Sequence, residues 1–163
     1  MTKMQEKEWL QNNRYYSELD EDKLKSVFYF SLIWNIYEKD LCGKDGKIRL
    51  HPEDHSAQFS EKLESNMLGG VFEYFKQRYI SEGLPTKYFD TFNFNSKSIK
   101  NMVFNYLSSA NPSNEEKLKA LLFIAFRLRN NLFHGVKNVE KLYEQNENFR
   151  QINILLMNLI ENK

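Results

Sequence analysis

The segment SNEEKLKALLFIAFRLRNNLFHG, which runs from Ser113 to Gly135, predicts a long helix in the core of an α-helical protein. Ser113 and Glu116 have the spacing of a capping box, in which each side chain satisfies a backbone amide at the start of a helix. The strongly apolar run from Leu118 to Phe126 follows, and Gly135 is the type of residue at which helices commonly end. The sequence therefore predicts both the start and the end of this helix.

Apolar residues recur at helical spacing on both sides of this segment, and further helices are expected at the following positions: residues 3–16, 24–41, 58–80, 96–107 and 139–160. Glycine and proline are scarce, with 6 and 3 residues, which favours helices over a turn-rich β fold. Repeats and low-complexity stretches are not evident in the sequence. The prediction is an all-α, single-domain bundle of about five helices over residues 1–163.

Three further expectations concern the first half of the chain. Residues 24–41 are apolar around much more than one face, so this helix is expected in the centre of the bundle. Residues 43–56 contain turn signals and are predicted to form a loop. The adjacent glycines Gly69 and Gly70 could bend or interrupt the helix predicted over 58–80, because paired glycines weaken a helix interior.

Composition limits the function classes. A formal net charge of +1 means that any contact with nucleic acid would depend on a local basic patch rather than on the whole molecule. The single cysteine, Cys42, excludes an intramolecular disulfide and fits a reducing compartment. The sequence shows no signal peptide and no apolar run long enough to span a bilayer. We therefore expect a cytoplasmic protein without a membrane partner.

The end of the helix over 113–135 carries more polar groups than a helix needs in order to stop. Two arginines, two asparagines and one histidine lie between Phe126 and Gly135. The pattern Arg129-Asn130-x-x-x-His134 resembles the motif of the HEPN superfamily, all-α nucleases in which Arg, usually a polar residue, and His are separated by about four to six positions. Arg127 also has a permitted spacing from His134, but the asparagine directly after Arg129 favours Arg129.

The resemblance implies a metal-independent endoribonuclease that uses no cofactor, with Arg129 and His134 as catalytic residues and Asn130 in support. Two protomers would bring their motifs together across a twofold axis, so that each site holds two Arg and two His. The products would carry 2′,3′-cyclic phosphate and 5′-OH ends. The partners implied are RNA, a second copy of the chain, and an antitoxin or defence-system protein, in the setting of a toxin or an anti-phage effector.

The chemistry of these side chains agrees with such a reaction. A histidine can take the proton of the ribose 2′-OH or give one to the leaving 5′-oxygen, and an arginine offers a fork of donors to the phosphoryl oxygens. On a continuous helix, Arg129 and His134 would lie roughly 140° apart around the axis. The helix is therefore expected to unwind near Phe133, with Gly135 in the left-handed conformation.

Glu38 is a further candidate, because it lies one turn after Trp34 at the end of the apolar helix over 24–41. Its carboxylate could pair with Arg129 and hold its side chain, or it could simply belong to a solvated helix end. His51 and His55 have a spacing that can bind zinc on a helix. However, Pro52 occupies the place of the glutamate of the zinc-protease motif, and the sequence supplies no third ligand. We predict no metal site.

Other interpretations of the motif remain open. Arg129 and His134 could neutralise the terminal carbonyls of a helix, as cations commonly do. The same bundle could also be a non-catalytic dimerisation or docking module of a defence or toxin–antitoxin complex, or an unrelated helical adaptor. The aromatic segment from Tyr88 to Asn95 could stack bases or could cover one end of the bundle.

Overall fold

The computed structural model describes residues 5–43, 52–134 and 139–163. Within these ranges the chain forms seven α-helices: α1 Glu6–Gln11, α2 Lys25–Leu41, α3 Pro52–Phe59, α4 Ser65–Tyr79, α5 Lys97–Ser108, α6 Asn114–Phe133 and α7 Val139–Glu161. Two short 3-10 helices and one antiparallel pair of two-residue strands complete it: η1 Asp22–Leu24, η2 Phe89–Phe92, β1 Ile80–Ser81 and β2 Leu84–Pro85. The all-α prediction is confirmed, with more helices than the five or so expected.

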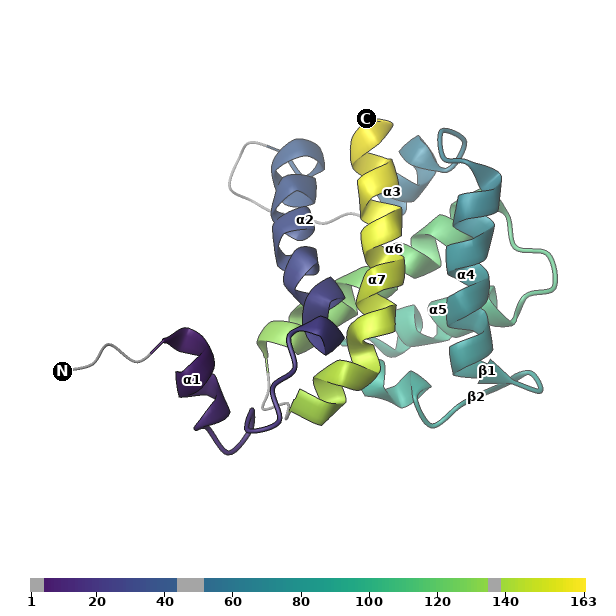
Figure 1. Ribbon diagram of the computed structural model, residues 1–163. Helices are drawn as coiled ribbons and strands as arrows, with labels where there is room; N and C mark the ends of the chain where they lie inside the picture. The colour runs from purple at the N-terminus through teal and green to yellow at the C-terminus, as the bar shows by residue number, and fades with distance from the viewer. Residues whose placement is uncertain (1–4, 44–51, 135–138) are drawn as a thin grey trace.

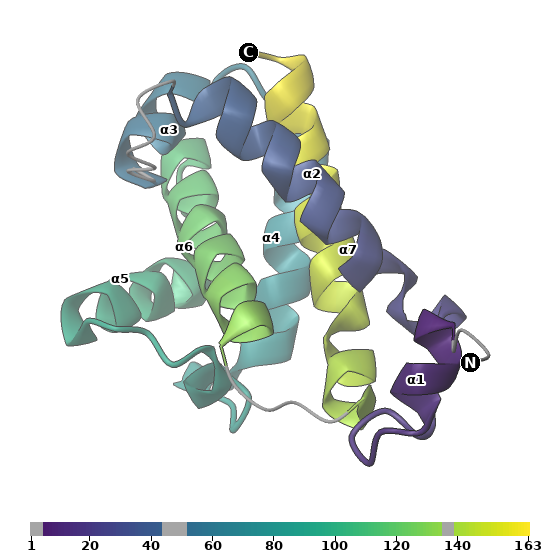
Figure 2. The same ribbon diagram turned by 90° about the vertical axis from the view of Figure 1, so that its left-hand side faces the viewer.

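The helix α6 occupies the middle of the molecule (Figures 1 and 2). It contacts α3, α4, α5 and α7, while α2 packs chiefly along α7. Buried residues occur around much of its circumference: Leu118, Ala120, Leu121, Leu122, Ile124, Ala125 and Leu128. These side chains join one hydrophobic cluster with buried residues of α2, α4, α5 and α7. The apolar run singled out in the sequence is therefore the centre of the core.

The capping box predicted at the start of α6 is present. The Oγ atom of Ser113 accepts a hydrogen bond of 3.2 Å from the backbone N–H of Glu116, whose Oε2 atom accepts one of 2.8 Å from the Ser113 N–H. This reciprocal pair is the capping box, and it begins α6 where the sequence predicted. At the start of α5, the Ser96 Oγ atom accepts from the N–H of Ile99.

The expectation that residues 24–41 form the central helix is wrong. One face of α2 packs into the core through Val27, Phe30, Trp34 and Tyr37. The opposite face is apolar but exposed, and we call it the α2 outer face; it consists of Phe28, Tyr29, Leu32 and Ile36. The sequence showed the apolar residues on both faces, but among the residues that the structure describes only the inner face is buried.

The expectations for residues 43–80 were also partly wrong. Instead of a loop up to residue 56 and a helix over 58–80, the chain forms α3 and α4 with a break over 60–64. Pro52 is the first residue of α3, a position where proline's missing N–H costs nothing. The α4 helix continues through Gly69 and Gly70 because buried neighbours such as Leu68 and Phe72 anchor it. Residues 44–51 lie outside the described part of the chain.

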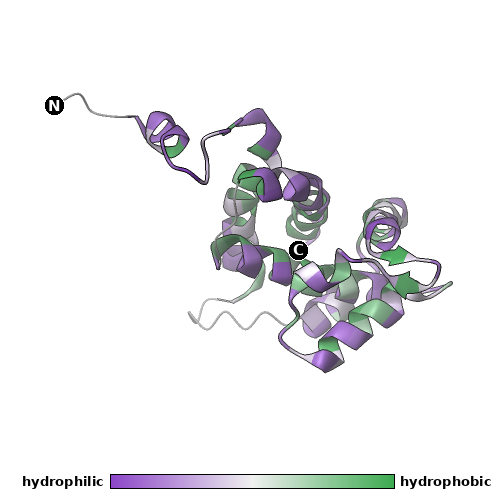
Figure 3. Ribbon diagram, turned by 90° about the horizontal axis from the view of Figure 1, so that it is seen from below, coloured by the Kyte–Doolittle hydropathy of each residue, from purple (hydrophilic) through white to green (hydrophobic). Residues whose placement is uncertain are grey.

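The first helix is shorter than predicted and stands apart from the other helices (Figures 1 and 3). Trp9, a large apolar residue of this helix, is 59% exposed. The chain after α1 is held to the start of α7: the carbonyl oxygen of Tyr15 accepts from the N–H of Val139 at 3.0 Å, and the hydroxyl of Tyr143 accepts from the N–H of Asp20 at 2.6 Å. Residues 3 and 4 of the predicted helix lie outside the described ranges.

Candidate functional site

The α6 helix stops at the residue on which the predicted chemistry depends. Its last helical residue is Phe133, and His134 follows with extended backbone angles, φ −118° and ψ 104°. The backbone N–H of His134 still donates to the carbonyl oxygen of Asn130 at 2.9 Å. His134 thus leaves the helix axis, as the sequence required. The left-handed conformation predicted for Gly135 falls outside the described residues.

His134 is exposed and opens onto a wide pocket of about 480 Å³. The lining residues are rich in side-chain amides: Asn93, Asn95, Arg127, Asn130, Asn131 and His134. A titratable ring beside amide donors and one guanidinium can hold an anionic, hydrogen-bonding ligand such as a phosphodiester. Asn93 and Asn95 were missed by reasoning from the sequence, although the repeated Phe-Asn pattern over residues 92–95 was a visible signal.

Arg127, the arginine of this pocket, is largely occupied by structural hydrogen bonds. Its Nε atom donates to the carbonyl oxygen of Phe92 at 2.9 Å, its Nη1 atom to Asn95 Oδ1 at 2.9 Å and its Nη2 atom to Asn131 Oδ1 at 3.2 Å. Asn131 in turn donates to the Phe92 carbonyl at 3.1 Å. Burial lowers the pKa of the Arg127 guanidinium, which nevertheless stays charged near neutral pH. Arg127 therefore holds the segment after η2 against α6.

Arg129 is not among the residues that line the His134 pocket, and its contacts lie elsewhere. Its Nη2 atom lies 4.0 Å from Glu38 Oε1, and its Nη1 atom donates to Asn130 Oδ1 at 3.2 Å. Its guanidinium carbon lies 5.6 Å from the ring centroid of Phe133, a cation–π distance. Its Nε atom is buried and has no hydrogen-bond partner within the described part of the chain. A donor of this positioned arginine is therefore unused.

Glu38 forms the contact with Arg129 that the sequence left open. Its Oε1 atom also accepts a hydrogen bond of 2.5 Å from the indole Nε1 of Trp34. The Glu38 side chain is only 17% exposed, which disagrees with the reading as a solvated helix end. The carboxylate therefore adds an ion pair to the contacts that Arg129 makes with Asn130 and Phe133.

Asn130 connects the two predicted catalytic residues. Its Oδ1 atom receives the hydrogen bond from Arg129, while its side chain also lines the pocket of His134. Within one chain, however, the pocket of His134 does not include Arg129. The two side chains leave α6 in different directions, as expected for residues five positions apart.

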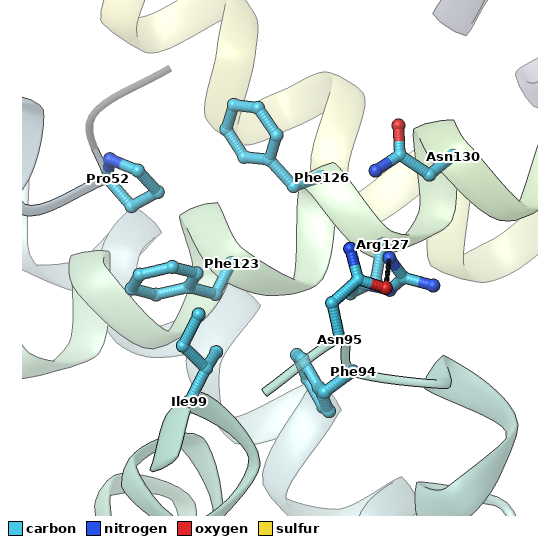
Figure 4. A pocket seen from close by; sticks show the side chains of 8 residues that line it. All are labelled: Pro52, Phe94, Asn95, Ile99, Phe123, Phe126, Arg127 and Asn130. Atoms are coloured by element: carbon cyan, nitrogen blue, oxygen red, sulfur yellow. Dashed lines mark hydrogen bonds between the residues drawn. The ribbon is translucent and has the colours of Figure 1, made fainter. Parts of the chain in front are cut away.

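A smaller, mostly apolar pocket of about 160 Å³ adjoins the His134 pocket (Figure 4). It is lined by Pro52, Phe94, Asn95, Ile99, Phe123, Phe126, Arg127 and Asn130. Asn95, Arg127 and Asn130 line both pockets. In the aromatic segment, Phe89 and Phe92 are buried and cover the bundle, whereas Phe94 is half-buried in the pocket wall. Covering the end of the bundle is thus confirmed for Phe89 and Phe92, whereas base stacking stays a prediction.

The two histidines considered for zinc do not form a described site. His55 is buried; its Nδ1 atom lies 2.7 Å from the hydroxyl oxygen of Tyr37 and its Nε2 atom 3.2 Å from the carbonyl oxygen of Leu41. His51 lies outside the described ranges. Among the residues whose positions are described, no three His, Cys, Asp or Glu side chains converge as metal ligands. Over the same residues, no helix has the length and apolar character needed to cross a membrane.

Comparison of the chain with protein-family models, with curated proteins and with solved structures gave no match. The candidate site is therefore defined by this chain's own residues. Those residues are Glu38 on α2, Arg129 and Asn130 near the end of α6, and His134 just beyond it.

Proposed function

We propose that the protein is a metal-independent endoribonuclease of the HEPN type, whose site is completed by a second copy of the same chain. The observation that carries this proposal is the divergence of Arg129 and His134 at the end of α6. His134 opens onto a pocket of about 480 Å³ that its own Arg129 does not line. In a twofold pair, the Arg129 of one copy can reach the phosphodiester held beside the His134 of the other.

The reaction would be an in-line transfer within the RNA. The ribose 2′-oxygen attacks phosphorus and its proton passes to one His134, while the bond from phosphorus to the 5′-oxygen breaks and that oxygen takes a proton from the other His134. The guanidinium of Arg129 donates to the phosphoryl oxygens as negative charge develops. Glu38 holds the guanidinium in place, and Asn130 joins the two parts of the site. The products carry 2′,3′-cyclic phosphate and 5′-OH ends.

The surface around the motif supports a paired assembly. The α2 outer face is exposed, and so is Phe133 at the end of α6. Figure 2 looks onto α2 and shows that the C-terminal end of α6 lies on the same side of the molecule. Large apolar side chains grouped near a candidate site are typical of a protein–protein contact. A second copy packed on this side would cover them and bring two motifs close together.

The second candidate function is a non-catalytic dimerisation or docking module. The same exposed α2 outer face favours it, and the charge of Arg129 is already partly balanced by Glu38. In that case, an antitoxin or another defence-system protein would be the ligand of this face. Either candidate function is compatible with a role in a toxin or in an anti-phage effector.

The test of the proposed function is cleavage of single-stranded RNA in excess EDTA, with mapping of the product ends. We expect cleavage to persist and to leave 2′,3′-cyclic phosphates. His134→Ala should reduce the rate by roughly 10²–10⁴-fold. Arg129→Ala should do the same, and Arg129→Lys should restore little, since an ammonium lacks the two-point fork.

The control is Arg150→Ala, which removes an exposed arginine of α7 and should leave the rate unchanged. The variants should also retain the helical circular dichroism of the wild type. A folded wild-type protein that cleaves no RNA would exclude the nuclease and leave the docking module. If His134→Ala lowered the melting temperature instead, His134 would have a structural role at the helix end.

A further inference from the structure

The apolar pocket beside His134 has the character of a site for a flat ring. Its walls include the aromatic side chains of Phe94, Phe123 and Phe126, all of which are half-buried and so keep accessible surface. In Figure 4, the rings of Phe123 and Phe126 and the side chain of Ile99 form the apolar part, and Asn95 and Asn130 lie toward the Arg127 side. Aromatic side chains of this kind stabilise an RNA base by stacking.

The polar end of this pocket presents hydrogen-bond donors. Asn95 Oδ1 accepts from Arg127 Nη1 at 2.9 Å, and Asn130 Oδ1 accepts from Arg129 Nη1 at 3.2 Å. These bonds orient both amides, because a guanidinium can only donate. Each amide then directs its Nδ2 amino group away from its arginine. No hydrogen bond from either Nδ2 is found within the described residues, so both groups are available to a ligand.

We infer that this pocket binds one base of the RNA next to the cleaved phosphodiester, and that it selects guanine. Guanine presents two neighbouring acceptors, N7 and O6, which match two amide donors. On the same edge adenine presents one acceptor and one amino donor, and cytosine an amino donor. The pocket shares Asn95, Arg127 and Asn130 with the pocket of His134, which places the base beside the reacting phosphate. The role of this base in cleavage rests on the proposed function, whereas the binding of guanine to the pocket does not.

The test compares the binding of guanosine 3′-monophosphate and adenosine 3′-monophosphate to the full chain by isothermal titration calorimetry. Neither nucleotide contains a bond that the proposed reaction can cleave. We expect the guanosine nucleotide to bind at least about tenfold more tightly, since a matched pair of hydrogen bonds discriminates by that order. Phe123→Leu should weaken the binding of both nucleotides by about tenfold and preserve the ratio of their affinities, because it removes the stacking surface but keeps apolar volume.

Asn95→Asp tests the predicted preference for guanine most directly. A carboxylate retains the contact with Arg127 but replaces the amide donor by an acceptor, so the preference for guanosine should disappear or reverse toward adenosine. Asn105→Asp adds the same charge at an exposed position of α5 and should leave the preference intact. Equal binding of the two nucleotides, binding of neither, or a guanosine preference that survives Asn95→Asp would overturn the inference. Guanosine binding without any RNA cleavage would instead count against the proposed nuclease alone.

Discussion

The Nη2 atom of Arg129 lies 4.0 Å from the Oε1 atom of Glu38, and this ion pair joins the end of α6 to α2. The same carboxylate oxygen accepts a hydrogen bond from the indole of Trp34. The Trp34 ring in turn packs edge-on against Phe126, with centroids 5.2 Å apart. The position of the arginine thus depends on the aromatic core between the two helices. The Arg129 side chain remains 33% exposed, so the pair is not closed to a ligand.

Substitution of Glu38 should separate its two roles, as the acceptor for the Trp34 indole and as the ion-pair partner of Arg129. Glu38→Ala leaves the indole N–H of the buried Trp34 without an acceptor and should lower the free energy of unfolding by about 1–2 kcal/mol. Glu38→Gln keeps an acceptor for the indole and loses only a partly exposed ion pair, so it should cost less than about 1 kcal/mol. Urea denaturation measures both values. Two variants as stable as the wild type would show that the contact between the helices does not depend on this carboxylate.

The two arginines near the end of α6, Arg127 and Arg129, should differ in their effects on stability. Arg127→Ala removes three hydrogen bonds that hold the segment after η2, and we expect a loss of about 1–3 kcal/mol in the free energy of unfolding. Arg129→Ala should cost about 0.5 kcal/mol or less, because its ion pair is long and partly exposed. Chemical denaturation of both variants checks this order, and the reverse order would contradict the assignment of Arg127 as the scaffold residue.

The α2 outer face should control assembly. Leu32 is 64% exposed in one chain, so Leu32→Glu should leave the stability of a monomer nearly unchanged. If two copies pair through this face, the variant should be monomeric by light scattering at micromolar concentration, while the wild type is a dimer. Leu84→Glu is the matched control, because Leu84 on β2 is similarly exposed but lies across the molecule from α2 (Figure 1). A monomeric wild type would exclude this mode of pairing.

A buried amide joins α4 to α7. Asn148 is fully buried; its Nδ2 atom donates to the hydroxyl of Tyr79 at 2.8 Å, and its Oδ1 atom accepts from the hydroxyl of Tyr74 at 2.8 Å. Asn148→Ala should lower the free energy of unfolding by about 2–4 kcal/mol, since it leaves polar groups unpaired and opens a cavity. Tyr74→Phe, which removes one hydroxyl from the edge of the network, should cost about 1 kcal/mol. Equal costs in denaturation experiments would show that the amide has no special role.

Cys42 should be unreactive at neutral pH. Burial, with a smaller contribution from the nearby carboxylate of Glu38, raises the pKa of its thiol from 9.0 to about 11. At pH 8 the folded protein should therefore react with iodoacetamide about a hundredfold more slowly than the urea-unfolded chain, because the thiolate is the nucleophile. A raised pKa also means that the folded state binds this proton more tightly. The associated stability is complete below about pH 9 and is lost as the pH rises through about 11. Equal alkylation rates in the two states would contradict this.

Local sequence determined most of the helix boundaries. The capping box of Ser113 and Glu116 and the hydroxyl of Ser96 act within a few residues, and so the starts of α6 and α5 could be predicted from their own neighbourhoods. The last helix follows the predicted range 139–160 almost residue for residue, because its apolar spacing is continuous. The predicted boundaries over residues 43–80 were partly wrong. The break over 60–64 and the start of α3 at Pro52 depend on which helices pack together, which local propensity does not encode.

By itself, the sequence determined the helical class, the long apolar helix α6 and the presence of arginine, asparagine and histidine at its end. Tertiary structure alone decided that Arg127 holds the segment after η2, whereas Arg129 pairs with Glu38, a residue far away in the chain. It also decided that the outer face of α2 stays exposed in one copy. The physical reason for this division is the range over which each signal acts. Caps and apolar periodicity act over a few residues. The direction of a long polar side chain and the burial of an apolar face depend instead on which distant segments pack nearby.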